Sequence, residues 1–178
     1  RAAVLACGRE ALTELLEMRG REGTALGAVL REHVAAMEAI VAGLAPLVPE
    51  LVARHQQKIV ERLQDALGLA LQDGGAPTIP RDEVAERIRQ EVTVYGVRID
   101  IAEELTRLAT HLAETRHVLE EGGKQGGKLG KRLDFMMQEL NREANTVGSK
   151  AAAKELADAA MALKLLIEQM REQVQNLE

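Results

Sequence analysis

The chain has 178 residues, a formal net charge of −5, and 46% hydrophobic and 29% charged side chains. This composition is typical of a folded domain and excludes both a disordered chain and a general electrostatic footprint for nucleic acid, so any RNA or DNA site has to be a local patch. The single cysteine, Cys7, excludes an internal disulfide and a multi-cysteine zinc site, and the 1% content of aromatic residues argues against a sandwich or barrel.

Apolar residues follow helical spacing from one end of the chain to the other, and alanine and leucine dominate them. Six helices are expected, over residues 2–19, 25–44, 49–71, 80–121, 131–146 and 151–176. Pro46 and Pro49 are expected to end the second helix, and the Gly- and Pro-containing segment 72–77 to end the third. The predicted fold class is therefore all-α, with five to six long antiparallel helices in an extended, coiled-coil-like bundle.

The apolar runs in the sequence are all short. No run approaches about 18 consecutive apolar residues, so no membrane span is expected. The chain begins at Arg1 already within a helical pattern, so we expect it to be a fragment of a longer protein.

The helix expected at 80–121 carries a polar stripe opposite its apolar face. At about 100° per residue, one side collects Asp100, Glu103, Glu104, Arg107, His111 and Glu114. A solvated face with ion pairs four residues apart is the plain interpretation. Asp100 and Glu104 form a like-charge pair at that spacing, however, which a purely stabilising face would avoid. Carboxylates with one histidine are also the ligands that a divalent cation prefers.

The helix expected at 131–146 is divided in the same way. Its apolar residues, Leu133, Met137, Leu140, Ala144 and Val147, repeat every three or four positions, and Asp134, Gln138, Asn141, Arg142 and Asn145 line the other face. Glu139 and Glu143 form a second like-charge pair at the border. Amide side chains beside Asp and Arg suggest either ligand recognition or a hydrogen-bond network between helices.

The segment between these two helices holds the main basic patch of the chain. Lys124, Lys128, Lys131 and Arg132 lie close together in a Gly-rich stretch. They form either a solvated loop or a contact for phosphate. Phe135, the only phenylalanine, lies toward the polar side, where it could stack on a base or fill a subunit interface.

A heptad seam runs along the last predicted helix. Leu156, Ala160, Leu163, Ile167, Met170, Val174 and Leu177 alternate at intervals of four and three. Such a seam packs along another helix, from this chain or from a second copy.

Two segments resemble the signatures of the YicC/YloC family. Residues 98–111 are similar to the family pattern RxDxxEELxRLxxH, and residues 130–150 to GxxLDFxxQExNREANTxxSK. The segment 163–178 resembles the C-terminal helix of the family, and residues 1–72 resemble its helical middle region more loosely. The matched polar residues include Asp100, Glu103, Glu104, Arg107, His111, Asp134, Gln138, Glu139, Asn141, Arg142, Glu143, Asn145, Thr146, Ser149 and Lys150.

The resemblance implies an endoribonuclease of the bacterial cytoplasm that depends on a divalent metal, with Mn²⁺ the expected ion and Mg²⁺ the alternative. It also implies a homo-oligomeric ring, expected to be a hexamer, that clamps RNA. An N-terminal domain normally precedes this part of the family. The chain is accordingly divided into a helical middle region, 1–76, and a C-terminal helical catalytic domain, 77–178.

Roles are assigned to the polar residues on this basis. The expected metal ligands are Glu104, His111, Glu139 and Glu143, with Arg107 and Arg142 binding the phosphate and Asp100, Glu103, Asp134, Gln138 and Asn145 supporting them. RNA contacts are expected from Lys124, Lys128, Lys131, Arg132, Phe135, Asn141 and Lys150. Alternatively, His111 acts as general base on the RNA 2′-hydroxyl. A helical RNA-binding or assembly module without catalysis remains the competing class.

The short connection between the two polar helices predicts an antiparallel hairpin. In that hairpin Glu104 and His111 are expected to converge with Glu139 and Glu143, which requires a compensating cation, Arg107 and Arg142, or both.

Overall fold

The computed structural model describes residues 2–72, 81–122 and 129–175. These form five α-helices: α1 (Ala2–Gln72), α2 (Arg81–Arg98), α3 (Ala102–Glu121), α4 (Leu129–Lys150) and α5 (Lys154–Gln175). No strand occurs among the described residues, so the all-α prediction is confirmed there.

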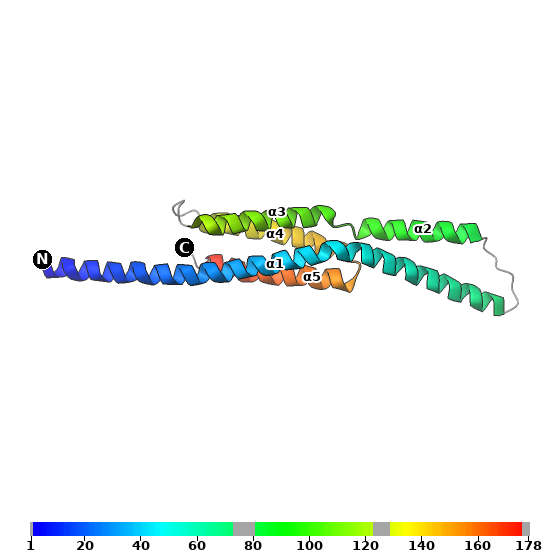
Figure 1. Ribbon diagram of the computed structural model, residues 1–178, viewed down its shortest axis with the longest axis horizontal. Coiled ribbons are helices and arrows are strands. Elements are labelled where there is room, and N and C mark those ends of the chain that lie inside the picture. The colour runs from blue at the N-terminus through cyan, green and yellow to red at the C-terminus, as the bar shows by residue number, and fades with distance from the viewer. Residues whose placement is uncertain (1, 73–80, 123–128, 176–178) are drawn as a thin grey trace.

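Four of the helices make a bundle. α3 and α5 each pack against both α1 and α4, which gives a closed ring of neighbours. Figure 1 shows α1 running the length of the molecule, with its N-terminal part extending past the bundle and its C-terminal part lying beside α2. The middle third of α1 is therefore the part that builds the core.

The core is formed by leucine, isoleucine, valine and methionine from all four bundle helices. From α1 it takes Leu30, Val34, Met37, Val41, Leu44 and Leu51, which share one face of that helix. The heptad residues of α5 are buried from Leu156 to Val174, and Leu177 lies outside the described residues. Since α5 packs against α1 and α4, the partner of the seam lies in this chain.

The expectation that Pro46 and Pro49 end a helix is wrong. Both lie inside α1, which continues to Gln72. A proline in a helix removes one hydrogen bond and crowds the preceding turn, which costs about 3 kcal/mol or more. Leu44 and Leu51 are buried on either side, so packing holds the helix together across the prolines, and α1 bends over this cyan region in Figure 1.

The long helix expected at 80–121 is interrupted, and not at its glycine. Gly96 lies within α2, and the break falls between Arg98 and Ala102. Ile99 and Ile101 are fully buried on either side of Asp100, whose Oδ1 accepts a hydrogen bond from the Ala102 N–H at 3.1 Å. Burial of both isoleucines and this short-range Asp100 hydrogen bond thus turn the chain into α3, whose N-cap position is Ile101.

The count of five reflects these two differences. The three helices expected over 2–71 merge into α1, and the one expected over 80–121 splits into α2 and α3. The last two predicted helices correspond to α4 and α5. The division of the chain into a middle region, 1–76, and a C-terminal domain, 77–178, remains a prediction.

One part of the chain departs from the expectation about membrane spans. The segment Ala2–Leu63 within α1 is long and apolar enough to cross a membrane by length and composition, with a mean hydropathy of 1.6 in its best window. A core helix passes the same test, and α1 supplies core residues from Leu30 to Leu51. One helix of this kind is therefore weak evidence for a membrane span.

Candidate active site

α3 and α4 pack side by side as a hairpin, as expected. α3 ends at Gly122, where φ is 53°, a left-handed conformation that glycine adopts without a Cβ clash. The apolar faces of both helices turn toward the core. Glu104 and Glu143 lie next to those faces, about 40° around their helices from Leu108 and Val147.

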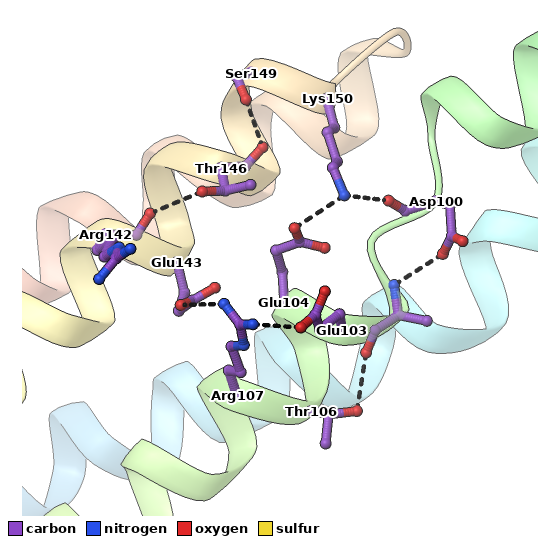
Figure 2. A network of polar contacts seen from close by, with 11 residues as sticks. Asp100, Glu103, Glu104, Thr106, Arg107, Arg142, Glu143, Thr146, Ser149 and Lys150 are labelled. Atoms are coloured by element: carbon purple, nitrogen blue, oxygen red, sulfur yellow. Dashed lines mark hydrogen bonds and ion pairs between the residues drawn. The ribbon is translucent and has the colours of Figure 1, made fainter.

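Glu104 and Glu143 are the two buried acidic residues among the described positions, 6% and 4% exposed. Figure 2 shows both side chains between α3 and α4, with the Glu104 carboxylate toward Lys150 and the Glu143 carboxylate toward Arg107. Carboxylates almost never lie inside a protein without a charged or hydrogen-bonding partner. Each of these has one, and the partners come from the opposite helix.

The partner of Glu104 is Lys150, from the last turn of α4. The Lys150 Nζ lies 2.9 Å from Glu104 Oε1 and donates a second hydrogen bond to the Asp100 carbonyl oxygen, also at 2.9 Å. Lys150 therefore connects the end of α4 with the turn before α3 (Figure 2).

The partner of Glu143 is Arg107. Its Nη1 lies 3.4 Å from Glu143 Oε1, and its Nη2 contacts the Glu103 carboxylate one turn earlier on α3. Glu103 and Glu143 together raise the pKa of Arg107 further above its ordinary value, Glu103 contributing most. Arg107 is thus held between two carboxylates while half of its side chain stays exposed. We call Asp100, Glu103, Glu104, Arg107, Glu143 and Lys150 the Glu104–Glu143 cluster.

One atom of the cluster lacks a partner. Glu104 Oε2 is buried and accepts no hydrogen bond from the described residues. An uncompensated buried carboxylate oxygen is costly, and it is a ready acceptor for a proton, a water or a cation.

The four predicted metal ligands do not all converge. Across the described residues, no three His, Cys, Asp or Glu side chains gather closely enough to hold a metal ion. His111 and Glu139 make no side-chain hydrogen bond or ion pair to the described part of the chain. A metal at Glu104 and Glu143 would have to complete its coordination with water or substrate oxygens.

Other predicted residues lie around the cluster or away from it. Arg142 lies beside Glu143 on α4, and its carbonyl accepts a hydrogen bond from Thr146, whose own carbonyl accepts one from Ser149. Asp134 accepts a hydrogen bond from Gln138 and pairs with Arg171 of α5, so these two residues face a different helix. Asn141 and Asn145 make no side-chain hydrogen bond within the described residues.

The basic patch is only partly described. Lys124 and Lys128 lie outside the described residues. Arg132 is paired with Glu114 and Glu121 of α3. Lys131, Arg132 and the half-exposed Phe135 line a cavity of 380 Å³ near the hairpin end, together with Glu114, Val118 and Met136.

The role of Lys150 inside the cluster was not foreseen, since this residue was assigned to RNA. The available signal was its position in the last turn of α4, which an antiparallel hairpin places opposite the first turn of α3. Asp100 and Glu103, three residues apart, likewise form the acidic pattern that marks a helix start.

Comparison with known proteins gives a consistent result. The family model described as "Endoribonuclease YicC-like, C-terminal" matches residues 44–178. "Probable endoribonuclease YicC" of Haemophilus influenzae is 39% identical over 168 residues, which cover 94% of this chain and 52% of that protein. A protein of the same description from Clostridioides difficile is 28% identical over 176 residues, covering 95% of this chain and 53% of that protein. The chain spans about half the length of these curated relatives.

Proposed function

Because the chain belongs to the family of YicC-like endoribonucleases, we propose that the protein cleaves RNA phosphodiester bonds and that the Glu104–Glu143 cluster is its catalytic centre. The observation that carries the proposal is the pair of buried carboxylates from two helices, with one carboxylate oxygen left without a partner. Acidic side chains are almost never buried unless they are paired, so two of them on facing helices are unusual for a surface that serves stability alone.

The cations of the cluster suit an RNA backbone. Arg107 has half of its side chain exposed, and Arg142, which precedes Glu143 on α4, is exposed as well. A guanidinium pairs with two oxygens of a phosphate at once and stabilises charge that develops during cleavage. We assign Arg107 and Arg142 to the scissile phosphate, with Glu103 holding Arg107 in place.

Glu104 and Glu143 are the residues that would hold a divalent cation, with Mn²⁺ expected and Mg²⁺ the alternative. When bound, such an ion supplies an activated water and neutralises charge on the transferring phosphoryl group. Lys150 competes for the same position, because its ammonium lies 2.9 Å from Glu104 Oε1. The proposal therefore requires that Lys150 moves away from Glu104 before a cation takes this position.

The approach of RNA is assigned to the hairpin end. Lys131 and Phe135 line the cavity of 380 Å³ there and provide a cation and an exposed ring. A phosphate would contact the lysine, and a base would stack on the ring.

A second chemistry within the same function uses His111 as general base on the RNA 2′-hydroxyl. It leaves a 2′,3′-cyclic phosphate, whereas water as nucleophile leaves an acyclic phosphate. Mass analysis of the products of one defined RNA distinguishes the two.

A helical RNA-binding or assembly module without catalysis is the second candidate. The observation in its favour is that Lys150 and Arg107 already compensate both buried carboxylates. In that case the cluster serves to fix the angle between α3 and α4.

We also propose a homo-oligomer, with a hexamer as the expected size, acting in the cytoplasm. The support is an apolar stripe on the part of α1 that extends past the bundle: Val4, Leu5, Leu12, Leu15, Leu16 and Met18 are all at least half exposed. At about 100° per residue this stripe continues the face that α1 buries from Leu30 onward. A second copy would cover it.

The test of the function is cleavage of end-labelled RNA by the purified protein with Mn²⁺, with Mg²⁺ and with EDTA. We expect cleavage with a metal and none with EDTA. Binding of RNA without cleavage under every condition would favour the second candidate, and neither binding nor cleavage would contradict both.

A further inference from the structure

A larger cavity lies away from the Glu104–Glu143 cluster, where three helices meet. It has a volume of 580 Å³ and lies between the second half of α1, the end of α2 and the start of α5. In Figure 1 this is the junction just beyond the bend of α1. The volume falls in the range of about 300–1,000 Å³ that is typical of small-molecule sites, and none of its lining residues belongs to the cluster.

The lining of this cavity is basic. Arg54, Lys58, Arg98 and Lys154 contribute four cations, against the two carboxylates of Glu91 and Glu155. Lys58, Arg98 and Lys154 form no ion pair with the described residues. In a chain of net charge −5, three cations without ion-pair partners around one cavity form a local site for an anion.

Two stacked rings form part of the cavity wall. The rings of His55 and Tyr95 lie parallel, 3.8 Å apart with an interplanar angle of 6°, and join α1 to α2. His55 Nε2 is buried and has no hydrogen-bond partner among the described residues. The stack holds α1 and α2 together at this wall of the cavity.

An acidic side chain of the protein already occupies part of the site. Glu155 is in the first turn of α5, and its carboxylate lies 2.8 Å from Arg54 Nη1. Contact with its own backbone N–H, and then with Arg54, lowers the pKa of Glu155. This end of α5 therefore stabilises a negative charge, as helix N-termini do.

We propose that this cavity binds the phosphate group of a nucleotide, with Lys58, Arg98 and Lys154 contacting its oxygens. Glu155 competes with the phosphate for Arg54 and for the start of α5. The phosphate is either a terminal one or a diester within RNA, since both present the same oxygens. The site needs no metal and stands whether or not the protein cleaves RNA.

The test is isothermal titration calorimetry on the whole protein in EDTA, which removes metal from the cluster. The ligands are inorganic phosphate, a nucleoside 5′-monophosphate, and a dinucleotide whose only phosphate is the internal diester. A response to the first two indicates a terminal phosphate, and a response to the dinucleotide indicates the RNA backbone. Circular dichroism confirms that each variant keeps its helices.

The deciding variants differ only in where charge is removed. Lys58→Gln/Arg98→Gln should weaken binding at least about tenfold, because each cation provides a charge-assisted hydrogen bond. Arg9→Gln/Lys164→Gln removes the same charge from exposed sites elsewhere and should leave affinity unchanged. Glu155→Gln should strengthen binding, because it removes the competing carboxylate.

Three results would overturn the proposal. The first is no saturable binding of any ligand at about 10 mM. The second is equal loss in the cavity variant and its charge-matched control, which would indicate general electrostatics. The third is an unchanged affinity in Glu155→Gln.

Discussion

At the scale of single residues, the notable feature is that two glutamates are buried and that only one of them has a cation at a short ion-pair distance. Lys150 approaches Glu104 at 2.9 Å, whereas Arg107 lies 3.4 Å from Glu143 and is shared with Glu103. Removing one member of a buried pair leaves the other uncompensated. Here both cations are partly exposed and can be hydrated, so neutralising a glutamate should cost little stability.

The glutamates can therefore be tested without unfolding the protein. Glu104→Gln and Glu143→Gln should each lower RNA cleavage at least about a hundredfold, because each removes a charge from the reaction centre. Each should also weaken Mn²⁺ binding in calorimetry. The helical signal in circular dichroism and the oligomer size should stay the same.

Glu32→Gln is the matched control, since Glu32 is exposed on α1 and makes no side-chain hydrogen bond or ion pair within the described residues. It should cleave at the wild-type rate. Wild-type cleavage by both cluster variants would show that the site lies elsewhere and that these carboxylates are structural.

Lys150 gives a second prediction at this scale. Lys150→Gln removes the ammonium from Glu104 and leaves that buried carboxylate without its ion pair. Mn²⁺ should then bind more tightly and raise the melting temperature more than in the wild type, because a ligand stabilises the folded state in proportion to its affinity. Equal thermal shifts in both proteins would contradict metal binding at Glu104.

At the scale of helices, the break between α2 and α3 depends on the side chain of Asp100. Its Oδ1 accepts the Ala102 N–H at 3.1 Å, one of the donors that a helix start leaves without a partner. Asp100→Ala should lower the free energy of unfolding by about 1 kcal/mol, the typical net value of one such hydrogen bond. Asp100→Asn keeps the acceptor and should cost clearly less, as urea denaturation can measure. Equal losses would mean that this hydrogen bond does not stabilise the start of α3.

The seam of α5 gives a matched pair of leucines on one helix. Leu163 is fully buried and Leu165 is 60% exposed. Leu163→Ala should destabilise the protein by about 2–5 kcal/mol through the cavity that it leaves, and Leu165→Ala by less than about 0.5 kcal/mol. Because the seam packs within the chain, the Leu163→Ala loss should not depend on protein concentration. A concentration-dependent loss would place the seam between subunits.

At the scale of the whole molecule, the bundle covers only the middle of α1. The residues at 2–24 are exposed throughout, although their apolar stripe continues the core face. Large exposed apolar surfaces mark interaction sites. This projecting segment, and not the α5 seam, is therefore the surface that a second copy would cover.

Leu12→Glu/Leu16→Glu tests this directly. The two leucines are 57% and 60% exposed, so the bundle should keep its melting temperature while the oligomer dissociates. Met161→Glu/Leu165→Glu places the same charges, at the same spacing, on an exposed face of α5 and should leave the oligomer intact. Light scattering measures both. A wild-type protein that is monomeric at micromolar concentration would contradict the oligomer itself.

The sequence by itself determined the all-α fold class, the family, the buried faces of α4 and α5 and the pairing of α3 with α4. All of these depend on residue spacing along one helix or on short motifs, which are local properties. Even Leu163 and Leu165 can be told apart in this way, because the heptad period includes one and skips the other.

The tertiary structure decided where helices end and which polar residues meet. α1 passes through Pro46 and Pro49 because Leu44 and Leu51 are buried on both sides, a stabilisation that no local signal contains. Glu104 meets Lys150, while His111 and Glu139 stay apart from them, because packing sets the rotation of each helix about its axis. The cavity at His55 and Tyr95 likewise exists only where α1, α2 and α5 meet, and those segments are distant in the sequence.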